Sequence, residues 1–373
     1  MNDLGQILTL WRELERTGTD YVLATVVAVE GSSYRRPGAQ MLLAQDGRRA
    51  GTVSGGCLEA SVAQRAWWLT ASGPVVERYS TQDDDDERPY GSGCGGVVHI
   101  LLERRQTAEP LLAWLERAFF ARVPVGMATI LEGAHLGARG LSGVAGETLI
   151  AGSALQSLAD SAFDYRTTFV REVDMGGTSA RALVEFRPAR SSLWIFSGGD
   201  DAKPVMQLAQ ALGWYVVVAD GRSHLATRER FPSAEDIRVL SIAELPETAE
   251  TQITLRSTDA AVVMTHSFEQ DSRVLASILA LDFPLAYLGA LGPQRRTREL
   301  LAEAARLLRL PAADDRIDRW LTQMNAPTGL DLGADTPATI ALSIVAEVQK
   351  SLTAATGKPL VQIRAAKPSL AHL

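Results

Sequence analysis

The chain has only two cysteines among its 373 residues, which is too few for a disulfide framework and typical of a reducing compartment. No stretch approaches the roughly 20 uncharged apolar residues that a membrane-spanning helix requires, so we expect no membrane segment. The first residues lack the basic segment and apolar run of a signal peptide. Together these absences predict a cytoplasmic protein.

Basic residues are not in excess either. Lys and Arg number 37 against 44 Asp and Glu, and the net charge of −7 argues against nucleic acid as the main partner. A hydrophobic fraction of 46% with a charged fraction of 22% is typical of a globular protein. The length exceeds that of one ordinary domain, so we expect two.

Apolar patterning predicts a first domain of mixed strands and helices. The predicted elements are a strand at 21–29, a hairpin at 40–44 and 50–54, a helix at 58–70, a strand at 97–102, a helix at 108–122 and strands at 124–131 and 181–186. The polar, proline-containing segment 187–192 is the best linker candidate. We therefore expect an α+β domain over 1–188, a Rossmann-like α/β domain over 189–352 and a tail over 353–373 that carries no structural signal.

Both cysteines lie in glycine-rich loops, Cys57 within residues 54–59 and Cys94 within residues 91–96. Flanking glycines permit close approach of a ligand and leave backbone N–H groups free to stabilise a thiolate. Cys57 also precedes the predicted helix at 58–70, whose N-terminal partial positive charge favours the thiolate. The candidate cofactor-binding residues here are Cys57, Cys94, Gly55, Gly56, Gly93 and Gly95. In the alternative interpretation, two small thiols are merely tolerated in tight turns.

Arg35 and Arg36 stand in a loop that the Gly, Ser and Pro content of residues 30–38 predicts. Their guanidinium groups are candidates for binding a phosphate, and solvated surface arginines are the alternative. The acidic run at 83–87 favours a hydrated loop over a hard-cation site, because like charges repel one another.

The second half begins like a dinucleotide-binding βαβ unit. A strand at 193–196, a glycine turn, a helix at 204–212 and a strand at 214–218 are predicted in that order. Asp220 follows the turn by about 20 residues, where a contact to ribose is expected. Gly198, Gly199 and Asp220 are therefore candidate cofactor contacts in a doubly wound parallel sheet.

The glycine fingerprint of this unit is incomplete. Ser197 stands at its first glycine position and Ala202 at its last. Asp200 and Asp201 stand where the helix N-terminus would receive a pyrophosphate, which two carboxylates repel. The sequence therefore favours the Rossmann fold over ordinary NAD(P) binding, which is kept as the weaker alternative.

Two more predicted strands, at 260–264 and 285–288, end in loops that carry His266 and Arg295. In a parallel sheet these loops share the carboxyl edge, where ligands bind. Arg295, with Arg296 beside it at the start of a helix, is a candidate anion contact. His266 is either a ligand contact or a loop histidine satisfied by the backbone.

Taken in order, these motifs resemble the XdhC/CoxI family, accessory proteins of molybdenum hydroxylases such as xanthine dehydrogenase. The resemblance extends over nearly the whole chain. The segments that carry it are Gly31-Ser32-Ser33, Arg36-Pro37-Gly38, 54–59 and 93–96, followed by Asp220-Gly221-Arg222, Thr265-His266, Tyr287-Leu288-Gly289 and 327–333. Ser197 and Pro293 depart from the family pattern, which weakens the transfer of nucleotide contacts to the second domain.

The resemblance implies a chaperone for the molybdenum cofactor, a molybdopterin with or without an appended nucleotide. Such a chaperone protects the sulfurated cofactor and delivers it to a molybdenum hydroxylase apo-enzyme. A cysteine desulfurase as second partner and a homodimer are further implications. Thiolates suit soft molybdenum, and arginines and backbone N–H groups suit the cofactor's phosphate. Cys57 is the first candidate for a molybdenum contact and Cys94 the second.

Two other functions stay open. One is an NAD(P)-dependent oxidoreductase that uses the Rossmann domain and a Cys57/Cys94 redox pair, and the other is a cysteine-based metal or redox sensor. The cysteine count argues against a xanthine dehydrogenase, because each iron–sulfur cluster of such an enzyme requires about four cysteines. With two cysteines, this chain by itself does not hold such clusters.

Overall fold

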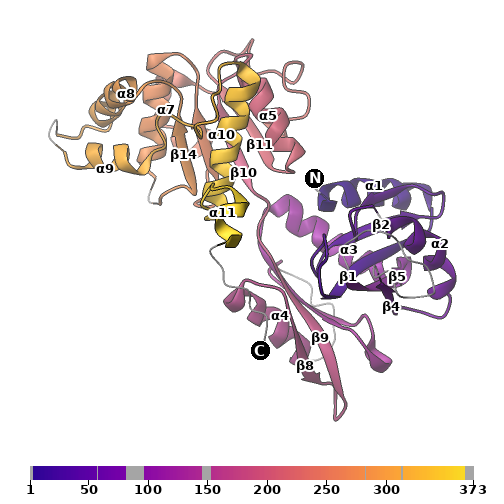
Figure 1. The fold of residues 1–373 in the computed structure, drawn as a ribbon. Coiled ribbons are helices and arrows are strands. Elements are labelled where there is room, and N and C mark those ends of the chain that lie inside the picture. The colour runs from indigo at the N-terminus through magenta and orange to yellow at the C-terminus, as the bar shows by residue number, and fades with distance from the viewer. Residues whose placement is uncertain are drawn as a thin grey trace. The chain divides into compact units, whose positions relative to one another are not determined.

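The structure is a computed structural model that describes residues 3–56, 58–80, 96–144, 153–281, 283–311 and 314–365. The chain divides into two compact units, Met1–Arg190 and Ser191–Leu373 (Figure 1). Each unit has its own sheets and its own hydrophobic clusters. Within the described ranges, no helix combines the length and the apolar character needed to cross a bilayer.

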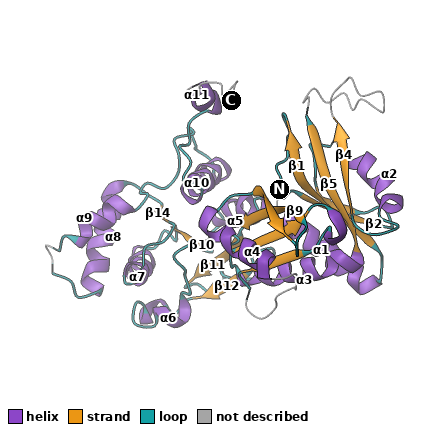
Figure 2. Cartoon of the chain, turned by 90° about the horizontal axis from the view of Figure 1, so that it is seen from below, coloured by secondary structure: helices purple, strands orange, loops and turns teal. Residues whose placement is uncertain are grey.

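An antiparallel five-stranded sheet forms the centre of the first unit, with the strand order β3-β2-β1-β5-β4. Its strands are β1 (Tyr21–Glu30), β2 (Gln40–Ala44), β3 (Arg49–Gly51), β4 (Val75–Ser80) and β5 (Val97–Arg104). Helices α1 (Asp3–Thr17) and α3 (Arg105–Ala121) cover one face, and α2 (Glu59–Leu69) covers the other (Figure 2).

Strand β1 is apolar on both of its faces. Tyr21 and Leu23 pack in the cluster formed with α1 and α3, whereas Val22 and Ala24 pack in the cluster formed with α2. Alternate side chains of a strand point to opposite faces, so a central strand covered on both sides requires an unbroken apolar run. This requirement accounts for the sequence of β1.

A second, four-stranded sheet in the same unit has the order β7-β6-β9-β8. Its strands are β6 (Val125–Ile130), β7 (Arg139–Ser142), β8 (Phe169–Asp174) and β9 (Ser179–Arg187), with the short helix η1 (Gly133–His135) and the covering helix α4 (Ser153–Tyr165). Arg139 on β7 forms an ion pair with both carboxylate oxygens of Glu103 on β5, and their side chains are only 7% and 0% exposed. This buried pair joins the two sheets.

The second unit is built on a parallel sheet with the order β12-β11-β10-β13-β14. Its strands are β10 (Ser192–Phe196), β11 (Tyr215–Asp220), β12 (Asp236–Val239), β13 (Ala260–Val263) and β14 (Tyr287–Ala290). On one face lie α5 (Ala202–Ala211) and α10 (Pro337–Leu352), and on the other lie α7 (Phe268–Leu279), α8 (Gln294–Leu307) and α9 (Arg316–Gln323) (Figure 1). The remaining short helices are η2 (Ile242–Glu244), α6 (Ala249–Gln252) and α11 (Leu360–Ala365).

The predicted fold class is confirmed, with an α+β unit followed by a doubly wound parallel sheet. Some predicted bounds are wrong. The strand expected at 285–288 is β14 at Tyr287–Ala290, and the strand expected at 50–54 is β3 at Arg49–Gly51. The tail, in which no structural signal is found, contains α11. Because Leu360 and Val361 of α11 are 63% and 74% exposed, this helix has no buried apolar face that a periodic pattern could reveal.

Removing the carboxylate of the buried pair tests how the two sheets are held. Glu103→Ala leaves the Arg139 guanidinium buried without its partner, so we expect the free energy of unfolding to fall by about 3–5 kcal/mol. Urea denaturation of the full-length chain measures this. In the control, Glu132→Ala removes the partner of exposed Arg181 and should cost about 1 kcal/mol or less. Equal losses in the two variants would show that the buried pair has no special importance.

Candidate functional site

The loops that carry the cysteines leave the first sheet at the same end. Residue Val97 at the start of β5 pairs with Glu30 at the end of β1 and with Ser80 at the end of β4. Antiparallel pairing also brings Gly51, the end of β3, opposite Met41 near the start of β2. The ends of β1, β3 and β4 and the start of β5 therefore lie at one end of the sheet, where Figure 2 shows β1, β4 and β5 side by side. Cys57, Cys94, Gly93 and Gly95 themselves lie outside the described residues.

A buried carboxylate closes the first cysteine loop. Oε1 of Glu59, at the start of α2, accepts hydrogen bonds from the N–H groups of Ser54 (2.8 Å) and Val53 (3.2 Å). The Ser54 hydroxyl donates to Oε2 of Glu59 (2.5 Å) and accepts from the N–H groups of Leu58 (3.0 Å) and Gly56 (3.2 Å). The residues on both sides of Cys57 are thus tied to one hydroxyl group.

The charge on Glu59 is stabilised by this loop. Glu59 is only 2% exposed, and burial would raise its pKa. The hydrogen bonds from Ser54 and Val53 outweigh this effect and hold the pKa of Glu59 below its usual range. A carboxylate that accepts several hydrogen bonds is strongly favoured in its ionised form. Glu59 therefore acts as an anion that fixes the shape of the loop.

One segment of the chain touches both cysteine loops. The ring of Tyr34 lies against Gly55, since a Cβ on that glycine would be 3.5–3.9 Å from three ring atoms. At the other loop, a Cβ on Gly96 would collide with the carbonyl oxygen of Ser32. Gly56 has a φ of +112° and would meet no atom within 4 Å of an added Cβ. The segment around Ser32 and Tyr34 is therefore shared, and no described residue other than its chain neighbours fills the space beside Gly56.

The two arginines of this segment differ in their surroundings. Arg35 forms an ion pair with Asp3 of α1. Arg36 is exposed and forms no ion pair with a described residue. Nearby, at the end of β1, Glu30 Oε1 lies 2.7 Å from His99 Nε2. Of the two predicted phosphate contacts, Arg36 is the one whose guanidinium is available.

In the second unit, Asp220 is engaged within the chain. Its carboxylate accepts from the N–H of Gly198 (2.6 Å) and from the Arg222 backbone N–H (2.8 Å) and Nε (2.9 Å). Burial would raise the pKa of Asp220, but the hydrogen bonds from Arg222 and Gly198 lower it. Sequence reasoning missed that Arg222, two residues on, takes the place expected for a ribose hydroxyl.

The glycine turn of this unit is covered by its own chain. A Cβ on Gly198 would lie 2.8–3.0 Å from three atoms of Leu225, and the N–H of Gly199 donates to the Ser197 hydroxyl (3.0 Å). A dinucleotide normally lays its pyrophosphate over such a turn. Gly198 and Gly199 thus have their N–H groups occupied by Asp220 and Ser197.

His266 and Arg295 lie at the carboxyl edge in different settings. His266 adopts φ 62°, rare for a residue with a side chain, and its Nε2 is 2.7 Å from Oδ2 of Asp201. Arg295 is 90% exposed and pairs with Glu299. Its neighbour Arg296 instead reaches Oδ2 of buried Asp271 (2.6 Å). Within the described ranges, no three metal-ligating side chains gather into a metal site.

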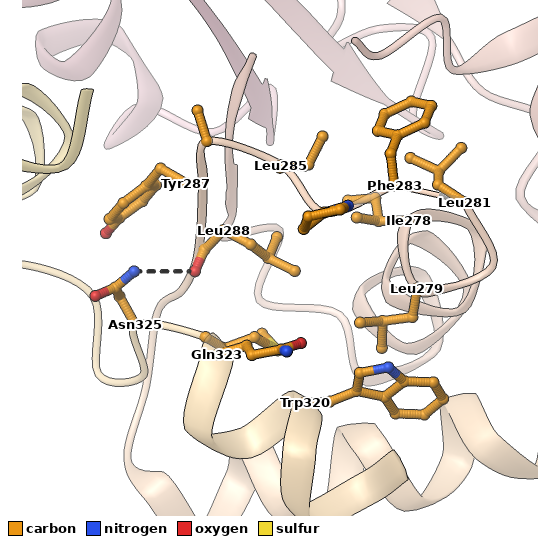
Figure 3. Close-up of a pocket in the computed structure, with 13 residues that line it drawn as sticks. Ile278, Leu279, Leu281, Phe283, Leu285, Tyr287, Leu288, Trp320, Gln323 and Asn325 are labelled. Atoms are coloured by element: carbon orange, nitrogen blue, oxygen red, sulfur yellow. Dashed lines mark hydrogen bonds between the residues drawn. The ribbon is translucent and has the colours of Figure 1, made fainter. Parts of the chain in front are cut away.

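A cavity of about 340 Å³ lies at the start of β14 (Figure 3). Leu279 of α7 and Trp320 and Gln323 of α9 line it, and the Asn325 amide donates to the Leu288 carbonyl oxygen (3.4 Å). None of its described lining residues is charged. Tyr287 is the one titratable side chain among the described lining residues, and burial raises its pKa.

Substitution of Glu59 tests the closure of the first cysteine loop. Glu59→Gln removes the charge that Ser54 and Val53 bind, so we expect a loss of about 1–3 kcal/mol in the free energy of unfolding at neutral pH. Because the folded-state pKa of Glu59 is lowered, its contribution is present above its unfolded pKa of about 4.3 and is lost as the pH falls through the folded value. The difference between wild type and variant should therefore shrink below about pH 4.

Urea titrations at several pH values measure this difference. Glu13→Gln is the matched control, because Glu13 is 51% exposed in its pair with Arg48 and should change stability by about 0.5 kcal/mol or less at any pH. A loss in Glu59→Gln that stays constant down to acid pH would contradict the assignment of Glu59 as a buried anion.

Comparison with known proteins places both units in one group. A family model described as the XdhC Rossmann domain matches residues 193–348, and a model described as the XdhC and CoxI family matches residues 14–80. Among curated relatives, a probable xanthine dehydrogenase subunit of Bacillus subtilis is 29% identical over 348 residues, covering 92% of this chain and 97% of that protein. The molybdenum cofactor insertion chaperone PaoD of Escherichia coli is 29% identical over 357 residues, covering 93% and 88%.

A solved structure agrees with this placement. The crystal structure of a protein described as a xanthine dehydrogenase from Bacillus halodurans superimposes with a TM-score of 0.69 at 26% sequence identity. The match covers 100% of this chain and 98% of that one. The order of both units is therefore shared with a solved protein along the full length.

Proposed function

Because the chain belongs to the XdhC and CoxI family, we propose that it binds the molybdenum cofactor, protects its sulfurated form and delivers it to the apo-enzyme of a molybdenum hydroxylase. The cofactor is the cargo of such a protein, not its resident group. The observation that carries the proposal is that the described residues flanking both cysteine loops lie at one end of the first sheet, where Gly55 and Gly96 lie against the segment around Ser32 and Tyr34.

The described residues of this end suit the cargo. A Cβ added to Gly56 would meet no described atom within 4 Å beyond its chain neighbours, and Ser54 and Glu59 hold the described part of the loop in one shape. Pre-organisation of this kind lowers the entropy lost on binding. Arg36 keeps its guanidinium available for a phosphate, which arginine binds through several N–H groups at once.

In this proposal each group has one task. The Cys57 thiolate contacts molybdenum or its sulfur, Cys94 assists from the second loop, and Arg36 binds the phosphate, with Arg35 adding positive charge. The cofactor supplies soft metal chemistry that thiolates match. A cysteine desulfurase as sulfur source, a homodimer and a cytoplasmic location belong to the same proposal, as does the choice between the molybdopterin and its nucleotide form.

The oxidoreductase alternative is not favoured by the second unit. Asp220 is bound by Arg222 and Gly198, and Leu225 covers the turn where a pyrophosphate would lie. A dinucleotide would have to displace these contacts. The proposed contacts of Gly198, Gly199 and Asp220 with a cofactor therefore require a rearranged turn. The proposed contacts of His266 and Arg295 do not, because these side chains are exposed.

Cofactor binding by cysteine variants tests the proposal. Cys57→Ser should weaken binding of the molybdenum cofactor by about tenfold or more, since it replaces a thiolate by a neutral hydroxyl, and Cys94→Ser should weaken it less. Arg36→Met should also weaken binding, whereas Arg16→Met, at an exposed position on α1, is the matched control and should not. Equilibrium binding and recovery of activity in an apo-hydroxylase measure both steps.

The outcomes separate the assignments from the function. Full affinity in Cys57→Ser would remove its role as a contact, while the chaperone role would stand. Absence of cofactor binding by the wild-type chain would overturn the proposed function itself. Tight NAD(P)H binding with turnover would instead support the oxidoreductase.

A further inference from the structure

A second cavity, of about 650 Å³, lies beside α5 in the second unit. One wall comes from α5 and the other from the segment that connects β11 to β12. Polar side chains dominate the lining, among them Lys203, His224, Thr227, Arg230 and Ser233. Neither the proposed function nor the candidate residues described above make use of this cavity.

Two cations of the lining share a single acceptor. Lys203 Nζ lies 2.7 Å and Arg230 Nη2 lies 2.9 Å from the same atom, Oδ1 of Asp200. Two positive charges thus converge on one carboxylate oxygen. Arg230 Nη2 also donates to the Gly198 carbonyl oxygen (3.2 Å), which fixes the position of the guanidinium.

The shared carboxylate is weakly attached. The Asp200 side chain is 82% exposed, so its ion pairs are made largely in water, where such pairs contribute little. Arg230 Nε, by contrast, is buried and has no hydrogen-bond partner among the described residues. A buried donor of this kind is costly unless an acceptor reaches it. Asp200, the acceptor of the two cations, is therefore easily displaced, and Nε of Arg230 is a donor without an acceptor among the described residues.

A phosphate group suits this pair better than the carboxylate does. Its several oxygens can accept from Lys203 and Arg230 separately, and it carries more charge than Asp200. The lining holds two cations, Lys203 and Arg230, against one carboxylate, Glu229. Once the Asp200 side chain rotates into solvent, the net charge of the cavity lining is positive.

We propose that this cavity binds a phosphate ester through Lys203 and Arg230, and that Asp200 occupies the cation pair as an internal competitor until the ligand displaces it. The site differs from the usual pyrophosphate position, since that turn is covered by Leu225. The proposal does not depend on the molybdenum cofactor function.

Variants with opposite expected effects test the competition. In titration calorimetry of the full-length protein with inorganic pyrophosphate, Lys203→Met and Arg230→Met should each weaken binding by roughly tenfold, because each removes a charge-assisted hydrogen bond. Asp200→Asn should strengthen binding severalfold, because the amide no longer competes for the cations. Arg306→Met removes a cation that is 71% exposed on α8 and is the matched control.

Lys203→Met is the decisive weakening variant, since the Lys203 side chain has no second contact with a described residue like that of Arg230 with Gly198. Opposite shifts in Asp200→Asn and Lys203→Met, with no change in Arg306→Met, support the site. Absence of pyrophosphate binding in both wild type and Asp200→Asn would overturn it. Equal weakening in Lys203→Met and Arg306→Met would also overturn it, because the ion would then respond only to net charge.

Discussion

The first candidate site depends on one buried carboxylate. Glu59 accepts hydrogen bonds from Val53 and Ser54, and Ser54 in turn holds the N–H groups on either side of Cys57. A buried carboxylate without donors would be costly, and a loop without this anion would lose its shape, so each stabilises the other. The result is that the described residues of the loop are held in one form, with no other described residue within 4 Å of a Cβ added to Gly56.

The two units use their polar groups in opposite ways. In the first unit, the end of the sheet keeps groups available, with exposed Arg36 and the exposed ring of Tyr34 beside Gly55. In the second, the carboxyl edge satisfies its own groups, as Asp220 binds Arg222 and Asp271 binds Arg296. At this edge, the described groups of Asp220 and Asp271 are therefore bound by other residues of the same chain. The fold supplies the position, and the side chains decide whether it is free.

Much of the fold could be predicted, because apolar periodicity records burial. The strand predicted at 40–44 is β2 without a change of bounds, and every residue of β2 is buried. The predicted bounds were less accurate for β14. This strand is bonded to a segment distant in the sequence, since the N–H of Asn325 donates to the Leu288 carbonyl oxygen. It failed for α11, whose Leu360 and Val361 are exposed. The sequence shows no periodic signal for strand bounds that depend on pairing with a distant segment. It also shows none for a helix whose apolar residues are exposed.

For the candidate site, the sequence by itself predicted the two cysteine loops, because cysteines among glycines have few structural uses. It also determined the doubly wound order of the second unit. Only the tertiary structure decided which charged groups are available: Arg35 pairs with Asp3, 32 residues away, whereas Arg36 does not pair with a described residue. It likewise decided that Lys203 and Arg230 meet at one oxygen of Asp200. The physical reason is that a charged side chain is neutralised by whatever lies near it in space, and spacing along the chain does not reveal that neighbour.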